Sequence, residues 1–247
     1  MKILEFRKIK KSFGKKKILK EVSFFVNEGE IFGLIGESGG GKSTLFSILT
    51  GFLEADSGEI FFKGERVQKR SPDFIANIGF ASQDDRLVEE LSIKENCFYF
   101  GALMNIRKAQ IEKKMNELLP VLKLEGAQNT LVKNLSGGMA KRANILVSLI
   151  HNPSILVLDE PTTGLDPLLR TVFWKHICEI KNKTKTTVLV ASHLLDEIEE
   201  NCDRIAVLKD GRIAVEGNPQ SFKALYNKEF REAFEEILKK GDGEIEK

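Results

Sequence analysis

Nine residues near the start of the chain, Gly36–Thr44, constrain its fold more than any other stretch. They fit the pattern Gly-x4-Gly-Lys-[Ser/Thr] of a P-loop, in which glycines let backbone N–H groups wrap closely around a phosphate. In this pattern Lys42 brings positive charge to the terminal phosphates, and the Ser43 hydroxyl is a ligand for Mg²⁺. The predicted nucleotide-binding residues of the loop are Gly36, Glu37, Ser38, Gly39, Gly40, Gly41, Lys42, Ser43 and Thr44.

The sequence on both sides of the P-loop supports this prediction. Residues 31–35 form an apolar run typical of a buried strand, and the residues from Thr44 onward have the spacing of a helix. The positive end of that helix would favour the same phosphate. A glycine-rich turn that matches the pattern by chance is the alternative, and the strand–loop–helix order disfavours it.

The length and composition are typical of a globular protein in a reducing compartment. Its 247 residues can form one large or two small domains. No apolar run approaches the ~18 residues that a membrane span needs, and residues 1–5 lack the apolar core of a signal peptide. The three cysteines, Cys97, Cys178 and Cys202, are scattered, so we expect neither structural disulfides nor zinc. The cytoplasm is the expected compartment.

A basic run at the N-terminus admits two interpretations. The net charge is only +2, but residues 1–20 contain nine Lys or Arg and one Glu. Such a run could bind nucleic acid or an anionic membrane surface. The alternative, which we favour, is a solvated strand whose lysines discourage edge-to-edge pairing. No nucleic-acid partner is therefore expected.

The order of patterns along the chain predicts an α/β core interrupted by helices. Strands are expected at residues 4–9, 22–26, 31–35, 59–62, 78–82, 155–158, 187–192, 204–208 and 213–215. Between residues 84 and 135 helical periodicity replaces strand patterns, and Ser92 with Glu95 forms a capping box. Further helices are expected at residues 137–150 and at an amphipathic stretch around residues 230–238.

Two adjacent acids, Asp159 and Glu160, close the buried apolar strand at residues 155–158. In P-loop enzymes a carboxylate at this position helps to hold Mg²⁺. A second carboxylate beside the nucleotide can deprotonate the attacking water. The alternative is that they merely cap the turn before Pro161. We favour a catalytic role for Glu160.

Four other features are ambiguous when taken singly. Ser136 with Gly137 and Gly138 stands where a helix begins, which is either a second anion site or an ordinary cap. Gln83 follows a predicted strand, where its amide could reach Mg²⁺ or the attacking water. His193 also follows a strand and could be a structural hydrogen-bonding group. Asp166 alone would be a turn residue.

Together, and in this order, these features resemble the nucleotide-binding subunit of an ATP-binding cassette (ABC) protein. The resemblance runs from about residue 4 to residue 219. The P-loop matches the family's Walker A motif, Gln83 its Q-loop, and residues 135–139 its signature motif. Residues 155–159 match its Walker B motif and Glu160 its catalytic glutamate. Asp166 matches its D-loop and His193 its switch histidine.

The resemblance implies an architecture. It is an α/β P-loop NTPase core of the ABC type, with an antiparallel β subdomain and an inserted α-helical subdomain. The implied ATPase domain spans residues 1–220, its helical subdomain covers about residues 84–152, and residues 221–247 form a helical tail.

The resemblance also implies a mechanism in which two cassettes pack head to tail. Each ATP lies between one copy's P-loop and the other copy's Ser136, Gly137 and Gly138. The implied Mg²⁺ ligands are Ser43, Gln83 and Asp159, and the implied catalytic residues are Glu160, His193, Gln83 and Asp166. Phe13 stands where the family stacks an aromatic ring on adenine, although core packing is an alternative for it.

Three residues depart from the family's commonest pattern: Phe13 in place of Tyr, Met139 in place of Gln, and Gly164 in place of Ala. The first loses a hydroxyl, and the second puts one polar contact across the dimer in doubt. Met139, followed by Lys141 and Arg142, resembles cassettes that pair with ABC-2-like exporters.

The leading functional hypothesis is an ATPase subunit that powers a transporter from the cytoplasmic face of the membrane. Its expected cofactors are ATP and Mg²⁺, and its expected partners are a second ABC subunit, identical or paralogous, and separate transmembrane permease chains. The alternative is a non-transport ABC ATPase of an assembly or mechanical-transmission complex. An inactive nucleotide sensor is a third hypothesis, and the presence of Glu160 and His193 argues against it.

Overall fold

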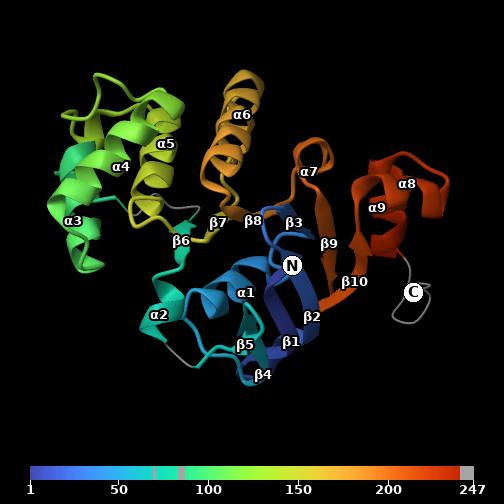
Figure 1. The fold of residues 1–247 in the computed structure, drawn as a ribbon. Helices are drawn as coiled ribbons and strands as arrows, with labels where there is room; N and C mark the ends of the chain where they lie inside the picture. Colours follow the sequence, from blue (N-terminus) through green and yellow to red (C-terminus); the bar gives the residue numbers. More distant parts are fainter. Residues whose placement is uncertain (69–70, 83–86, 240–247) are drawn as a thin grey trace. The chain divides into compact units, whose positions relative to one another are not determined.

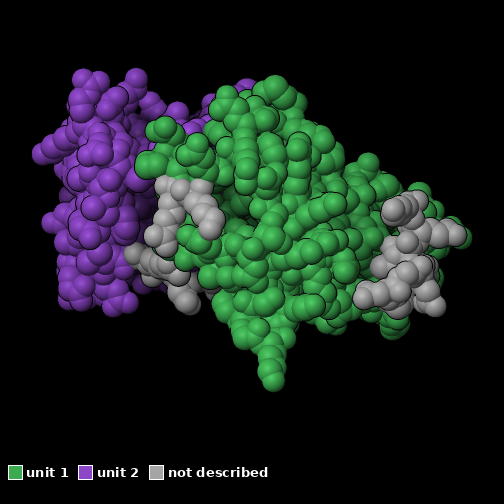
Figure 2. Space-filling model, turned by 90° about the horizontal axis from the view of Figure 1, so that it is seen from below, with its two compact units in different colours: residues 1–75, 187–247 green, residues 76–186 purple. Residues whose placement is uncertain are grey.

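The computed structural model describes residues 1–68, 71–82 and 87–239 (Figure 1). The chain divides into two compact units, which Figure 2 colours separately. Unit 1 contains residues 1–75 and 187–247, and unit 2 contains residues 76–186. The predicted domain boundaries stay predictions.

Unit 1 contains an antiparallel sheet with the strand order β2-β1-β4-β5. Its strands are β1 (Lys2–Phe13), β2 (Lys16–Asn27), β4 (Ser57–Phe62) and β5 (Glu65–Arg66). Phe6 of β1 and Phe24 of β2 stack with ring centroids 4.5 Å apart, and Phe24 also stacks on Phe32 of strand β3 (Ile31–Ile35) at 5.3 Å. β1 and β2 are longer than predicted, because their lysine-rich ends continue to pair as far as the turn at Gly14.

Unit 1 also contains four further strands in the order β10-β9-β3-β8. They are β3 (Ile31–Ile35), β8 (Thr187–Ser192), β9 (Arg204–Lys209) and β10 (Arg212–Gly217). β3 runs parallel to both β8 and β9. Every residue of β3 and β8 is buried, as expected of parallel strands that are covered on both faces. The predicted bounds of these two strands are confirmed.

Five helices belong to unit 1 among the residues described. They are α1 (Lys42–Leu49), α2 (Pro72–Ile75), α7 (Leu195–Asn201), α8 (Pro219–Tyr226) and α9 (Phe230–Lys239). The predicted amphipathic helix is confirmed as α9, which packs against α7 and α8. It buries one face, formed by Phe230, Ala233, Phe234 and Ile237.

Unit 2 is mainly helical. Its strands β6 (Ile78–Ala81) and β7 (Ile155–Asp159) are parallel. Its helices are α3 (Ile93–Leu103), α4 (Lys108–Val121), the short 3₁₀ helix η1 (Val132–Asn134), α5 (Gly137–Ser148) and α6 (Pro167–Thr184). The Ser92–Glu95 capping box is confirmed at the start of α3. Within the described ranges, no helix has both the length and the apolar character needed to cross a membrane.

Candidate functional site

The P-loop follows β3 and needs glycine for measurable reasons. A Cβ added to Gly36 would lie 2.3 Å from the Leu208 carbonyl oxygen of β9, a distance that no side chain tolerates. Gly41 has a φ of 107°, and a Cβ there would lie 2.8 Å from a methyl carbon of Leu19. The loop therefore lies directly against β2 and β9. Close approach and left-handed backbone are the two properties that glycine supplies to a phosphate loop.

Lys42, the first residue of α1, is 5% exposed. Its Nζ donates to the Gly36 carbonyl at 2.9 Å and to the Glu37 carbonyl at 3.1 Å. These two hydrogen bonds join the end of the P-loop to its beginning. Ser43 is exposed and Thr44 is half-buried, so the Ser43 hydroxyl faces solvent at the start of the helix.

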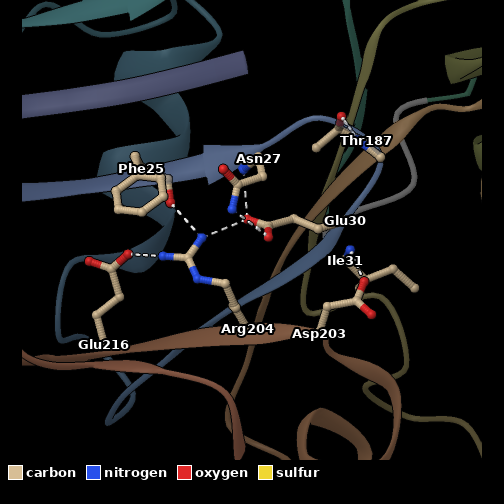
Figure 3. Close-up of polar contacts among 9 residues, drawn as sticks. Phe25, Asn27, Glu30, Ile31, Thr187, Asp203, Arg204 and Glu216 are labelled. Carbon is tan, nitrogen blue, oxygen red and sulfur yellow. Dashed lines mark hydrogen bonds and ion pairs between the residues drawn. The ribbon is translucent and has the colours of Figure 1, made fainter. Parts of the chain in front are cut away.

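A polar network anchors the strand that enters the P-loop (Figure 3). Arg204 of β9 donates to the Glu30 carboxylate at 2.9 Å and pairs with Glu216 of β10. Its guanidinium also lies 4.2 Å from the centre of the Phe25 ring. Because Glu30 directly precedes β3, the network ties the start of that strand to β9 and, through Arg204, to β10.

Two further contacts complete this anchor. The Ile31 backbone N–H donates to the Asp203 carboxylate at 2.8 Å, and the Gly29 N–H donates to the Thr187 hydroxyl at 2.9 Å. The turn before β3 is therefore tied to β8 as well as to β9. Sequence analysis missed this network, since its members are separated by about 170 positions in the chain.

His193 and the P-loop both follow the carboxyl-terminal ends of strands in the same sheet. β3 and β8 are parallel, and Ile35 is the register partner of Ser192. Gly36 and His193 therefore follow neighbouring strands at their carboxyl ends, where ligands bind in open α/β sheets. The His193 side chain is exposed, and the Ser192 hydroxyl accepts a hydrogen bond from the Leu194 N–H at 3.0 Å.

Phe13 ends β1 and its side chain is 52% exposed. That exposure is incompatible with the alternative of core packing. An exposed aromatic ring at a hairpin tip can instead stack on a flat ligand. The Lys11 Nζ lies 5.7 Å from the centre of the Phe13 ring.

In unit 2, the two acids that end β7 are buried: Asp159 is 6% exposed and Glu160 is 9% exposed. Glu160 has a φ of 49°, in the left-handed region that non-glycine residues rarely adopt. The Thr163 hydroxyl donates to its carboxylate at 3.3 Å. Nine other described non-glycine residues also have a positive φ, so the candidate role of Glu160 rests on its place directly after β7 and beside Asp159. The sequence gives no signal for this conformation.

The signature segment (Leu135–Met139) presents an open helix terminus. Ser136 caps α5 and its hydroxyl accepts a bond from the Met139 N–H at 3.3 Å. Ser136 and Gly137 are exposed, and a Cβ on Gly137 would meet nothing within 4 Å. The first turn of α5 is therefore open to solvent at Gly137, and the start of a helix suits an anion.

The start of α6 lies beside this segment. A Cβ on Gly138 would lie 3.4 Å from a methyl carbon of Leu169. Asp166 caps α6, accepting a bond from the Leu169 N–H at 3.0 Å. Leu168 between them is 74% exposed, a large apolar side chain that sequence analysis did not single out.

The predicted Mg²⁺ ligands can be judged by their chemistry. Ser43 offers an exposed hydroxyl and Asp159 a carboxylate, and both are the hard oxygen donors that Mg²⁺ prefers. The third predicted ligand, Gln83, lies outside the described residues. Unit 1 thus contains Phe13, the P-loop and His193, while unit 2 contains the signature segment, Asp159, Glu160 and Asp166.

Comparisons with known proteins agree with one another. A family model described as "ABC transporter" matches residues 19–163. The chain is 36% identical over 221 residues to the Nod factor export ATP-binding protein I of Paraburkholderia xenovorans, covering 90% of this chain and 72% of that protein. It is 39% identical over 213 residues to the Rhizobium sp. (strain N33) protein of the same name, covering 86% of this chain and 70% of that one.

Solved structures show the same likeness. The structure of an ATP-binding subunit of an ABC transporter matches with a TM-score of 0.85 and 26% identity, covering 96% of this chain and all of that one. The Clostridium perfringens subunit cbiO1, part of the ABC transporter complex cbiONQ, matches with a TM-score of 0.81 and 29% identity. That match covers 92% of this chain and 91% of the subunit.

Proposed function

The chain belongs to the ABC transporter family as an ATP-binding subunit, and we propose that it powers a membrane transporter through ATP-driven, head-to-tail dimerisation. The predicted ABC-type α/β fold is confirmed by the structural relatives. The observation that carries the dimerisation proposal is the exposed start of α5. Its N–H groups would serve as a second anion site, completing the nucleotide site of a partner copy, and the exposure of Ser136 and Gly137 supports this role.

Each proposed role follows from the chemistry of the side chain. Lys42 and the loop N–H groups would hold the β- and γ-phosphates, and the exposed Phe13 ring would stack on adenine. Glu160 would accept a proton from the attacking water, while His193 would hold the water and the γ-phosphate in line.

The proposed metal site uses oxygen donors. Ser43, Gln83 and Asp159 would hold Mg²⁺, which when bound would neutralise charge on the phosphates. Asp166, which caps α6 beside the signature segment, would support the facing surface of the dimer.

Replacing Ser136 with Arg is expected to block ATP-driven dimerisation and to leave ATP binding by the monomer within about twofold of the parent. The long cation fills the open space in front of the helix, but the P-loop is untouched. Sedimentation with and without ATP measures the first effect, and nucleotide titration the second. Asn129→Arg, an exposed change in the same unit, serves as control. Dimerisation of Ser136→Arg at the parent's ATP concentration would refute the trans site.

The proposed role in transport is tested by identifying the membrane chains that co-purify with this protein. The curated relatives are described as export proteins, so we propose export as the direction. Purification of the chain from detergent-solubilised native membranes should bring with it a polytopic chain, and alkaline washing of the intact membranes should release this protein while the polytopic chain stays in the bilayer. Recovery without any membrane chain would favour the alternative function in an assembly or mechanical-transmission complex.

A further inference from the structure

Arg142 links two helix ends in unit 2. It lies on α5, one turn after Gly138, and its Nε donates to the Gly138 carbonyl at 3.0 Å. Its Nη1 donates to the carbonyls of Leu122 at 3.0 Å and Lys123 at 3.3 Å. α4 and α5 are neighbours in Figure 1, and this one guanidinium joins the end of α4 to the start of α5.

The two carbonyls that Arg142 reaches at this end lie just after α4. The helix ends at Val121, and Lys123 turns the chain away with a φ of 50°. The carbonyls of Leu118, Leu119 and Pro120 in the last turn already accept backbone N–H groups. Arg142 supplies donors to the next two carbonyls from another helix, and its positive charge is favourable beside the negative end of α4. Its planar fork can serve separate acceptors at once, which an ammonium on a flexible stem does less well.

The arrangement has a cost that stability alone does not explain. Arg142 is half-buried, and burial lowers the pKa of its guanidinium. Among the described residues it has no carboxylate partner; all of its hydrogen bonds go to backbone carbonyls. A partly buried charge without an opposite charge is unfavourable, and a neutral side chain would avoid this.

The neighbouring helix offers no compensation. His176 of α6 is 2% exposed, and neither of its ring nitrogens has a hydrogen-bond partner in the described part of the chain. Burial lowers the pKa of His176, and the positive charge of Arg142 lowers it further. His176 thus supplies no opposite charge to Arg142.

We propose that Arg142 is a positioning residue that locks the signature segment into the geometry which receives the γ-phosphate of the partner copy. Its hydrogen bond to the Gly138 carbonyl would hold the first turn of α5 in its helical geometry, with the N–H groups at the start of the helix directed outward. Arg142 also fixes this end against the end of α4. The inference rests on the proposed trans site.

The test compares Arg142→Met and Arg142→Lys with Lys141→Met, a matched loss of charge from the adjacent residue of the same helix. Sedimentation in a Glu160→Gln background measures ATP-driven dimerisation, and nucleotide titration measures binding by the monomer. Arg142→Met should weaken dimerisation about tenfold or more, as expected for loss of charge-assisted hydrogen bonds, with monomer binding unchanged. The dimerisation strength of Arg142→Lys should lie between those of Arg142→Met and the Glu160→Gln background, and that of Lys141→Met should equal the background.

Dimerisation of Arg142→Met at the background level, or an equal loss in Lys141→Met, would overturn the proposal. If Arg142→Met fails to fold, the Lys variant decides by the same criteria. Amide hydrogen exchange in the ATP-free monomer tests the role of Arg142 separately from the trans site. In this monomer Arg142→Met should speed exchange at residues 137–139, even if ATP never drives dimerisation. Unchanged exchange at these residues would contradict the proposal that Arg142 holds the start of α5 in place.

Discussion

Replacing Lys42 with Ala is expected to weaken ATP binding about 100-fold or more. The ammonium is the one charge within the P-loop that can neutralise the terminal phosphates, and charge-assisted hydrogen bonds are each worth about 1.5–3 kcal/mol. It also closes the loop through its bonds to the Gly36 and Glu37 carbonyls. Two such contributions lost together correspond to two or more decades in the dissociation constant. Calorimetric titration with ATP measures the change.

Two further variants separate the effect of the Lys42 charge from the effect of its packing. Because the side chain is 5% exposed, Ala also leaves a cavity, whereas Lys42→Met keeps most of the buried stem. Lys42→Met should therefore lose nearly as much ATP affinity as Lys42→Ala, but less of the free energy of unfolding. Lys63→Ala, at an exposed turn of unit 1, should bind ATP like the parent. Parent-like affinity in Lys42→Met would mean that the lysine is structural.

Sequence patterns predicted the strands that are buried on both faces with their correct bounds. β3 and β8 are short, continuous apolar runs between turn residues, so local composition determines where they begin and end. The open start of α5 was also predictable, because Ser136 is a capping residue directly before a helical pattern. Each of these features depends on residues that are adjacent in the chain.

The features that sequence analysis missed depend on distant partners. Gly36 must be glycine because Leu208 approaches it, and Arg204 matters because Glu30 lies beside it. Nothing near Arg142 in the sequence indicates that it reaches the end of α4. Such pairings are set by tertiary packing, which overrides local preference. Helix α6 is a different case, because Asp166 before Pro167 is a local start signal that was interpreted only as a turn residue.

Replacing Glu160 with Gln is expected to lower the rate of ATP hydrolysis at saturating ATP by about 10²–10⁴-fold, the range that general-base catalysis contributes. The amide keeps the size of the side chain but cannot take a proton from water. Because the strained φ of 49° belongs to the backbone and Gln can adopt it at similar cost, the fold of the turn should persist. Release of inorganic phosphate under single-turnover conditions measures the chemical step directly.

The same variant should accumulate as a dimer with ATP, since binding continues and the step that opens the dimer has stopped. Glu179→Gln, on α6 of the same unit, is the matched control and should hydrolyse ATP at the parent rate. Adding Lys42→Ala to Glu160→Gln should abolish the trapped dimer, because the trans site closes only over bound nucleotide. Hydrolysis by Glu160→Gln at the parent rate would contradict the general-base role. A slow variant that never dimerises would keep that role and count against the proposed dimer.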